Sequence, residues 1–395
     1  MKLARRTTQI AASPTLALSA KAKELKSQGI DVIDFGVGEP DFDTPEHIKQ
    51  AGIKAIQSGF TKYTAAAGIP ELKKVIVEKL KKNNNLEYTQ AQVLIGCGGK
   101  HVLYDIMWAL IDSGDEVILP APYWVTYPEQ VKMSDGVNVI IQTKEENDFK
   151  MTPEEFRAAI TPKTKALILN SPSNPTGSLY TPEELKAIAD ICVEKGIYVI
   201  SDECYEDLVY DGKQVSIASF GPEIKELTVV CYTFSKSYSM TGWRLGYCAG
   251  PTDIIKAMSE FQSHTTSNPT SFVQKAGIEA LVSPQSAPAM KAMYDEFDKR
   301  RIRTVELLNQ VPGVTCRTPS GAFYAFPNIT GLLGKTYKGR KVENDSDLSA
   351  FLLEEAHIAV VPGSSFGFDG FLRFSYATSM ENIEKGISRM IEVLK

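Results

Sequence analysis

The chain has 395 residues, of which 43% are hydrophobic and 23% are charged, and these proportions exclude a disordered or fibrous protein. Its 43 basic and 48 acidic residues leave a net charge of −5 without a basic stripe, so we expect no nucleic-acid partner. Every uninterrupted apolar run is far shorter than the ~20 residues that cross a bilayer, so we expect no membrane-spanning segment.

The apolar stretch near the N-terminus does not fit a secretory signal, because Ser13, Pro14 and Thr15 interrupt it and a charged helical pattern follows. The six cysteines contain no CxxC pair and the four histidines are scattered, which argues against a metal site and a redox motif. We therefore expect free thiols, no metal, and an enzyme of the cytoplasm.

Helical and strand-like patterns alternate between about residues 45 and 250. We expect helices over 45–58, 70–82, 100–111, 152–160 and 181–195, and strands over 93–96, 116–120, 138–143, 165–170, 197–203, 227–236 and 244–250. Apolar strands separated by amphipathic helices predict an α/β fold, with a mostly parallel sheet that helices cover on both faces.

The pattern changes after about residue 285, where a long charged helix (288–310) leads into short strands and further helices (346–357 and 380–395). The first 45 residues carry one helix and one strand, VIDF, which is too little to fold alone. We therefore expect a large domain over 46–284 and a smaller α+β domain built from both termini, 1–45 and 285–395. A cleft between two domains is a common place for a ligand site.

Polar residues follow four of the predicted strands. These segments are CGGK (97–100), NSPSNPTG (170–177), DECY (202–205) and SKS (235–237). Because functional loops in open parallel sheets follow the carboxyl ends of the strands, we expect these residues to meet at one edge of the sheet.

The chemistry of these segments is that of a cofactor site. Gly98 and Gly99 at a helix start could offer backbone N–H groups to a phosphate, or could simply form a strand-to-helix turn. Asp202, at the end of an apolar strand, must be hydrogen-bonded or paired, for example with a cationic ligand nitrogen. Lys236, with Arg244 eight positions on, is either a surface lysine or an amine that attacks carbonyls. A phosphate-binding turn, a buried acid, a lysine and an arginine together match the needs of pyridoxal phosphate.

Seven motifs extend this pattern over essentially the whole chain. They are GVGEPDFDTP (36–45), KYTAAAGIPELK (62–73), PYWVTYPE (122–129), NSPSNPTG (170–177), SDECYEDLVY (201–210), SKSYSMTGWRLGY (235–247) and LRFSYATS (372–379). In this order they resemble the fold-type I, class I/II pyridoxal-phosphate aminotransferases, specifically the bacterial and archaeal aspartate aminotransferases of the Iγ subgroup.

The resemblance implies a role for each matching residue around the cofactor ring. Lys236 would hold the cofactor as a Schiff base and later move a proton between Cα and C4′. Asp202 would pair with the pyridine nitrogen and keep it protonated. Asn174 and Tyr205 would hydrogen-bond the ring oxygen O3′, and Trp124 would stack on the ring.

The resemblance also implies how the phosphate and the substrate are held. The phosphate would be bound by the backbone N–H groups of Gly99 and Lys100, by Ser235 and Arg244, and by Tyr63 of a neighbouring subunit. The active unit would therefore be a homodimer. Arg373 would bind the substrate α-carboxylate as a bidentate pair, beside Gly38.

The implied reaction is a ping-pong transamination, aspartate + 2-oxoglutarate = oxaloacetate + glutamate. Our alignment puts Pro14, Leu16 and Trp108 where relatives bind the distal carboxylate of aspartate, with Thr15 as a further candidate. The apolar Leu16 and Trp108 favour the alternative of an aminotransferase for aromatic, alanine or other neutral amino acids. A C–S β-lyase of the same fold is a third reading.

Two further positions separate this chain from relatives that accept prephenate. Ala11 and Gly36 stand where those proteins carry a lysine and a threonine, so we do not expect prephenate activity. For His264, in a loop that borders the cofactor in relatives, we expect a packed or exposed side chain. Among other classes, a ligand-sensing transcriptional regulator lacks a DNA-binding module here, and a nicotinamide dehydrogenase lacks its third glycine and leaves Lys236 unexplained.

Overall fold

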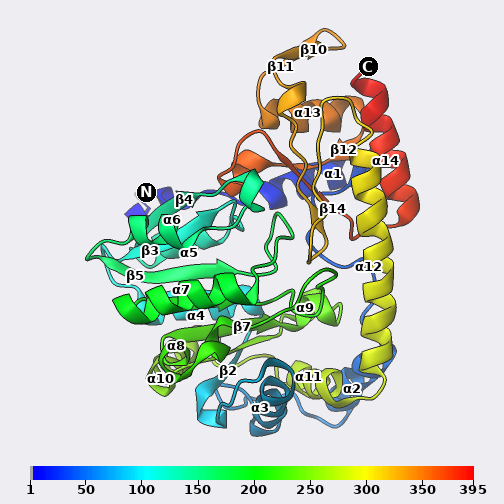
Figure 1. Ribbon diagram of the computed structural model, residues 1–395. Coiled ribbons are helices and arrows are strands. Elements are labelled where there is room, and N and C mark those ends of the chain that lie inside the picture. The colour runs from blue at the N-terminus through cyan, green and yellow to red at the C-terminus, as the bar shows by residue number, and fades with distance from the viewer. Residues whose placement is uncertain (1–2) are drawn as a thin grey trace.

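The structure is a computed structural model that describes residues 3–395. Its centre is a seven-stranded sheet in the order β2-β8-β7-β6-β5-β3-β4 (Figure 1). The strands are β2 (Val93–Gly96), β3 (Glu116–Ala121), β4 (Val137–Gln142), β5 (Thr164–Asn170), β6 (Tyr198–Asp202), β7 (Thr228–Thr233) and β8 (Gly246–Ala249). Within this sheet β8 is antiparallel to both neighbours and the other adjacent pairs are parallel, so the predicted mostly parallel sheet is confirmed.

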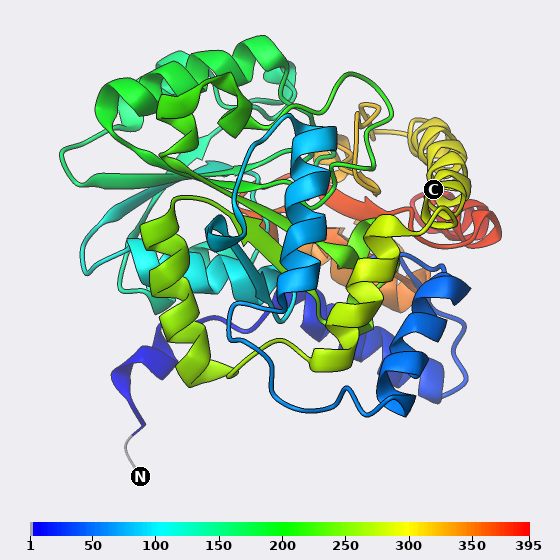
Figure 2. The same cartoon turned by 90° about the horizontal axis from the view of Figure 1, so that it is seen from below.

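Helices cover both faces of the sheet, as Figure 2 shows from below. They are α2 (Glu46–Gln57), α3 (Pro70–Asn84), α4 (Gly99–Leu110), α5 (Tyr127–Met133), α6 (Pro153–Ala159), α7 (Pro182–Lys195), α8 (Pro222–Lys225), α10 (Thr252–Thr265) and α11 (Ser271–Val282). Successive strand residues face opposite ways: Val117 and Leu119 pack with α4, α5 and α10, whereas Ile118 packs with α6, α7 and α8. Helices α2, α3 and α11 cover the β2-β8-β7 end of that second face.

The ends of the helices follow from local hydrogen bonding. In α7 the Thr181 side chain accepts from the Glu184 backbone, Glu184 reaches back to the Thr181 N–H, and Pro182 occupies the first turn. The helix ends at Gly196, whose φ of 66° is costly for other residues. The same capping box, with Thr152 and Glu155, starts α6.

The remaining elements form a second body above the large sheet (Figure 1). They are α1 (Pro14–Ser27), β1 (Ile33–Asp34), α12 (Ser286–Leu308), β9 (Tyr324–Ala325), β10 (Lys335–Tyr337), β11 (Arg340–Val342), α13 (Asp345–Glu355), β12 (Ile358–Ala359), β13 (Val361–Pro362), β14 (Leu372–Ser375) and α14 (Met380–Val393). Ile33 and Phe35 pack into one core with Phe297, Phe374 and Ile387, so segments from both ends of the chain share this core. The domain boundaries at 46 and 284 stay a prediction, and residues 1–2 lie outside the described residues.

Two details differ from the sequence-based expectations. The strand expected over 227–236 ends at Thr233, because the Thr233 hydroxyl accepts from the Ser235 N–H at 3.2 Å and starts the one-turn helix α9 (Phe234–Ser237). Helices α10 and α11 fill a stretch for which we predicted no element. Over residues 3–395 no helix has the length and apolar character needed to cross a membrane.

Candidate active site

A cavity of about 450 Å³ lies at the carboxyl ends of the parallel strands, between the large sheet and the second body. It is lined by eleven of the residues predicted for the site: Gly38, Gly99, Lys100, Trp124, Asn174, Asp202, Tyr205, Ser235, Lys236, Arg244 and Arg373. Tyr63 is absent from this lining in the described chain, and its side chain is 88% exposed. The four polar segments therefore meet at one edge of the sheet, as expected.

One end of the cavity is shaped for an anion. Helix α4 begins at Gly99, so its free N–H groups and the positive end of its dipole face the cavity. Gly98 has φ 89°, and a Cβ there would lie 2.7 Å from Nη2 of Arg244. Arg244 donates through Nη1 to the Thr241 carbonyl at 2.8 Å, which fixes its guanidinium beside the turn. These groups could hold a phosphate.

Asp202 ends strand β6 and is 4% exposed. Its carboxylate accepts from the Tyr127 hydroxyl at 2.7 Å and from the Cys204 N–H at 3.2 Å. Burial raises the pKa of Asp202, and neither hydrogen bond supplies a positive charge. A cationic ligand nitrogen would complete this site and keep the carboxylate charged.

Lys236 lies in α9, directly after β7, and its amine donates to the carbonyl of Gly38. The pKa of this amine is lowered to about 8, chiefly by burial, with the positive charges of Arg373 and Arg244 adding to the effect. An amine with such a pKa is partly neutral near pH 7 and can act as a nucleophile or a base.

Arg373, on β14, is buried and held in one orientation by two hydrogen bonds. It is 2% exposed, and it donates through Nη1 to Oδ1 of Asn174 at 2.9 Å and through Nη2 to the Gly36 carbonyl at 2.6 Å. Its buried Nε has no partner in the described chain. A guanidinium has five N–H donors, so three remain for a ligand, enough for a bidentate pair.

The Arg373 contact also orients Asn174. Because an arginine can only donate, Asn174 must turn its carbonyl oxygen to Arg373, and this leaves its NH₂ group for an acceptor in the cavity. Asn170 supports the same loop: its Oδ1 accepts from the Asn174 N–H at 2.9 Å and its Nδ2 donates to the Asp202 carbonyl at 3.0 Å.

The end of the cavity beside α1 holds Ser13 in addition to the candidates Thr15 and Leu16. The hydroxyls of Ser13 and Thr15 lie 3.0 Å apart, and both residues line the cavity with Leu16, whereas Pro14 does not. Lys100 also lines this cavity, and its amine lies 4.9 Å from the centroid of the Trp124 ring.

The two other candidates on this side lie away from the cavity in the described chain. Trp108 stacks on Phe261 at 4.1 Å between ring centroids and does not line the cavity of its own chain, so a place for Trp108 in a substrate site stays a prediction. His264 lies in the last turn of α10 rather than in a loop, and it is exposed, as expected.

The comparisons with known proteins agree with this geometry. The family described as aminotransferase class I and II matches residues 30–390. The chain belongs to that family. It is 51% identical to the aspartate aminotransferase of Geobacillus stearothermophilus, over 99% of this chain and 98% of that protein. It is 49% identical to a protein of Aquifex aeolicus named probable aspartate/prephenate aminotransferase, over 100% and 98% of the two chains.

A solved aminotransferase structure has the same fold. The aspartate aminotransferase of Rhizobium meliloti superposes with a TM-score of 0.96 at 42% identity, and the match covers 100% of this chain and 99% of that one. The predicted α/β fold and the predicted family are therefore confirmed. Aminotransferases of class I and II depend in general on pyridoxal phosphate. Among the described residues there is no cluster that could hold a metal ion.

Sequence reasoning gave no individual role to Ser13, Tyr127, Asn170 and Tyr324, which all line the cavity. Tyr127 stands one helical turn after Trp124 inside a motif that we had quoted, so its spacing was a usable signal. Tyr324 comes from β9, and its place depends on strand pairing across the second body. No local pattern indicates that pairing.

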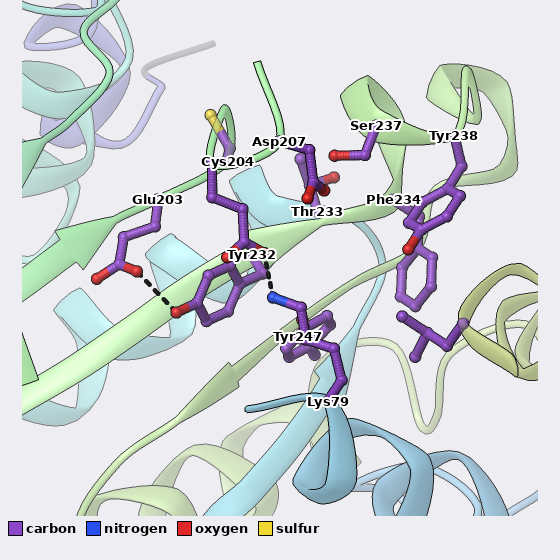
Figure 3. A pocket seen from close by; sticks show the side chains of 12 residues that line it. Lys79, Glu203, Cys204, Asp207, Tyr232, Thr233, Phe234, Ser237, Tyr238 and Tyr247 are labelled. Carbon is purple, nitrogen blue, oxygen red and sulfur yellow. Dashed lines mark hydrogen bonds and ion pairs between the residues drawn. The ribbon is translucent and has the colours of Figure 1, made fainter. Parts of the chain in front are cut away.

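Two buried carboxylates, Glu203 and Glu206, hold the segment that carries Asp202 and Tyr205. Figure 3 shows Glu203 with its hydrogen bond to Tyr232. Glu203 accepts from the hydroxyls of Ser201, Ser216 and Tyr232 at 2.9, 2.6 and 2.7 Å. Glu203 does not line the cavity, so these bonds hold the segment from outside it.

Helix α3 adds a second anchor to this loop. Glu206, directly after Tyr205, pairs with Lys79 and accepts from Nδ2 of Asn84 at 2.6 Å. Both partners of the ion pair are 11% exposed. The pKa of Glu206 is about 7, because burial raises it more than Lys79 lowers it. Without Lys79 the Glu206 carboxylate would lose the charge that stabilises its ionised form.

Replacing Lys79 by methionine is expected to destabilise the protein strongly, because it leaves Glu206 buried without a cation. Removing one partner of a buried ion pair typically costs about 3–5 kcal/mol in the free energy of unfolding. Urea unfolding measures this loss. The double variant Lys79→Met, Glu206→Gln should recover much of it. Lys81→Met, at a lysine of the same helix that forms an exposed pair with Glu87 beyond the helix end, should cost less than ~1 kcal/mol. Equal losses for Lys79→Met and Lys81→Met would contradict the anchor.

Proposed function

We propose that the protein is a pyridoxal-phosphate-dependent aspartate aminotransferase. L-Aspartate would give up its amino group and leave as oxaloacetate, and 2-oxoglutarate would take the group and leave as glutamate. The observation that carries this proposal is the convergence of the Lys236 amine, the Asp202 carboxylate and the Arg373 guanidinium on one cavity. Relatives named aspartate aminotransferase over the full chain support it.

The residues present fit the cofactor. Asp202 lacks a cationic partner among its hydrogen bonds, and a ring nitrogen would provide it. The phosphate would lie against the first turn of α4, beside Arg244 and Ser235, where Gly98 leaves no room for a side chain. The amide of Asn174 and the hydroxyl of Tyr205 would hydrogen-bond the ring oxygen, and Trp124 would cover the ring. When bound, this cofactor withdraws electrons from the substrate Cα.

Lys236 supplies both the attachment and the base. Its amine, with a pKa of about 8, would hold the cofactor covalently, and once the substrate amine has displaced it, the freed Lys236 amine would be placed to take the proton from the amino-acid Cα. General acid–base catalysis is most effective when the pKa of the group lies near the working pH. The burial that lowers the pKa of Lys236 thus serves the reaction.

Arg373 would bind the α-carboxylate of both substrates through its three free donors. Its contacts to Asn174 and Gly36 hold the guanidinium in place before substrate arrives, which limits the entropy lost on binding. A carboxylate fixed here orients the Cα–H bond relative to Lys236.

Aspartate differs from neutral amino acids by a distal carboxylate, and we propose that Lys100, Ser13 and Thr15 bind it. The phosphate would be bound by the backbone N–H of Lys100. The side-chain amine of Lys100 therefore remains available for another anion. Burial lowers the pKa of Lys100, with Arg244 adding to the effect, and an anion would offset both. A second candidate, an aminotransferase for neutral amino acids, is favoured by one observation, the apolar Leu16 on the same cavity wall.

Replacing Lys100 by methionine is expected to separate these candidates. The backbone N–H stays, so cofactor binding should persist, whereas kcat/KM for aspartate should fall roughly 10- to 100-fold, as for a lost hydrogen bond to a charged group. The kcat/KM for alanine should change little. Lys132→Met, at an exposed lysine on α5, is the control. If kcat/KM falls equally for aspartate and alanine, Lys100 does not bind the distal carboxylate.

We also infer that the working unit is a homodimer. Tyr63 lies in the loop between α2 and α3 and exposes 88% of its surface, so its ring and hydroxyl are accessible to another chain. A second copy of this chain would cover the ring and take its hydroxyl to the phosphate end of the partner's cavity. The cytoplasmic location and the lack of prephenate activity, argued from Ala11 and Gly36, stay part of this proposal.

A further inference from the structure

Tyr324 contacts both Arg373, the proposed carboxylate binder, and Tyr205, the proposed partner of the cofactor ring oxygen. The proposed function gives Tyr324 itself no role. It lies on β9, is 1% exposed, and lines the cavity. In the register of β9 with β14, Tyr324 stands opposite Ser375, so it is diagonal to Arg373 on the same face of the strand pair.

The ring of Tyr324 supports Arg373. The guanidinium carbon lies 4.6 Å from the Tyr324 ring centroid and 5.0 Å from that of Phe366. A cation over an aromatic face is held in place by the quadrupole of the ring, and the contact is strongest where water is excluded. Burial lowers the pKa of Arg373, and the two rings face the charge without neutralising it.

The hydroxyl of Tyr324 supports Tyr205. The two hydroxyl oxygens are 2.8 Å apart, and the rings meet edge to face at 5.8 Å between centroids. Gly38 permits this approach, because a Cβ there would lie 2.9 Å from the Tyr324 hydroxyl. The hydrogen bond is buried, so water does not compete for either hydroxyl.

The number of protons fixes the direction of this hydrogen bond. A tyrosine hydroxyl has one proton to donate. If Tyr205 donates its proton to the ring oxygen of the cofactor, it must accept from Tyr324. Burial raises the pKa of Tyr324 to about 12, so it keeps its proton and can donate.

We propose that Tyr324 is a positioning residue that links recognition of the substrate carboxylate to the cofactor: its ring holds Arg373, and its hydroxyl donates to Tyr205 so that the Tyr205 proton points at the ring oxygen. This inference rests on the proposed function. A chain of two hydroxyls polarises each member, so the bond from Tyr205 to the ring oxygen is stronger than it would be alone.

Tyr324→Phe tests the hydroxyl and leaves the ring. A donor at the ring oxygen stabilises its anionic form, so the loss of that support should raise the pKa read from the pH dependence of the bound cofactor's visible absorbance, by roughly half a unit to one unit. The dissociation constant of maleate, a four-carbon dicarboxylate that takes the place of substrate, should stay within about threefold, since the ring under Arg373 remains.

Three further variants complete the test. Tyr324→Leu removes the ring and should also weaken maleate binding, by roughly 5- to 30-fold. In a Tyr205→Phe background, Tyr324→Phe should shift the spectral pKa no further, because both act through one hydrogen-bond chain. Tyr337→Phe removes a buried hydroxyl bonded to the Leu332 carbonyl, outside the cavity lining, and should leave both quantities unchanged.

An unchanged spectral pKa in Tyr324→Phe, or a full additional shift in the Tyr205→Phe background, would overturn the inference. Tyr324→Phe removes one oxygen atom and is expected to fold, which thermal unfolding can verify. The test of the hydroxyl therefore remains available even if Tyr324→Leu does not fold. Failure of the proposed function looks different: the wild-type chain would then develop no visible absorbance with pyridoxal phosphate at any pH.

Discussion

Lys236→Ala is expected to abolish the visible absorbance that wild-type protein shows with pyridoxal phosphate, and to lower turnover by on the order of a million-fold. The alanine removes both the group that attaches the cofactor and the base placed to take the Cα proton. Absorbance spectra and steady-state rates measure the two losses. The first turn of α4 and Arg244, which would bind the phosphate, remain, as do Asp202 and Asn174. The cofactor should therefore still bind, though more weakly, and equilibrium dialysis measures this.

Two controls make this result specific. Lys275→Ala removes a lysine of α11 that pairs with Glu71 of α3 at the surface. It should change neither the spectrum nor the rate. Methylamine added to Lys236→Ala should restore part of the rate, because a free amine can occupy the space of the missing one. Turnover near the wild-type value without added amine would show that another residue is the base.

Arg373→Leu is expected to raise KM for the amino donor and for the oxo-acid acceptor alike, because one guanidinium receives the α-carboxylate of both. Truncating one partner of a buried charged pair costs about 2–5 kcal/mol, so kcat/KM should fall roughly 30-fold to several thousand-fold for each substrate. Steady-state kinetics with aspartate and 2-oxoglutarate measure both values.

The conservative Arg373→Lys is the matched variant. It keeps the positive charge but loses the planar fork that meets a carboxylate bidentately, so its kcat/KM should lie between those of wild type and Arg373→Leu. Thermal unfolding controls for the loss of the bonds to Asn174 and Gly36. Unchanged KM values in Arg373→Leu would mean that a different residue binds the α-carboxylate.

The alternation of strands and helices was predictable because each pattern is local. Strand residues such as Val117, Ile118 and Leu119 are apolar on both faces, which is typical of a covered parallel strand, and caps such as Thr181 mark helix starts. Lys236 and Asp202 were predictable for a related reason: both follow apolar strands of one sheet, so their loops must meet.

The contacts that depend on pairing across the chain were not predictable. Tyr324 and Tyr205 are 119 residues apart, and Lys79 and Glu206 are 127 residues apart, so no window of sequence contains either pair. At the start of α1 a shift of one residue exchanges Pro14 for Ser13 or Thr15, since neighbours on a helix point about 100° apart. The structure places both hydroxyls beside the cavity, together with the apolar Leu16.

The central claim is that this cavity runs an aspartate transamination in two half-reactions. The most direct measurement is the visible spectrum of the purified protein with pyridoxal phosphate, recorded before and after L-aspartate and again after 2-oxoglutarate. We expect a yellow band that aspartate bleaches and 2-oxoglutarate restores. A band that aspartate leaves unchanged would contradict the substrate, and no band at all would contradict the cofactor.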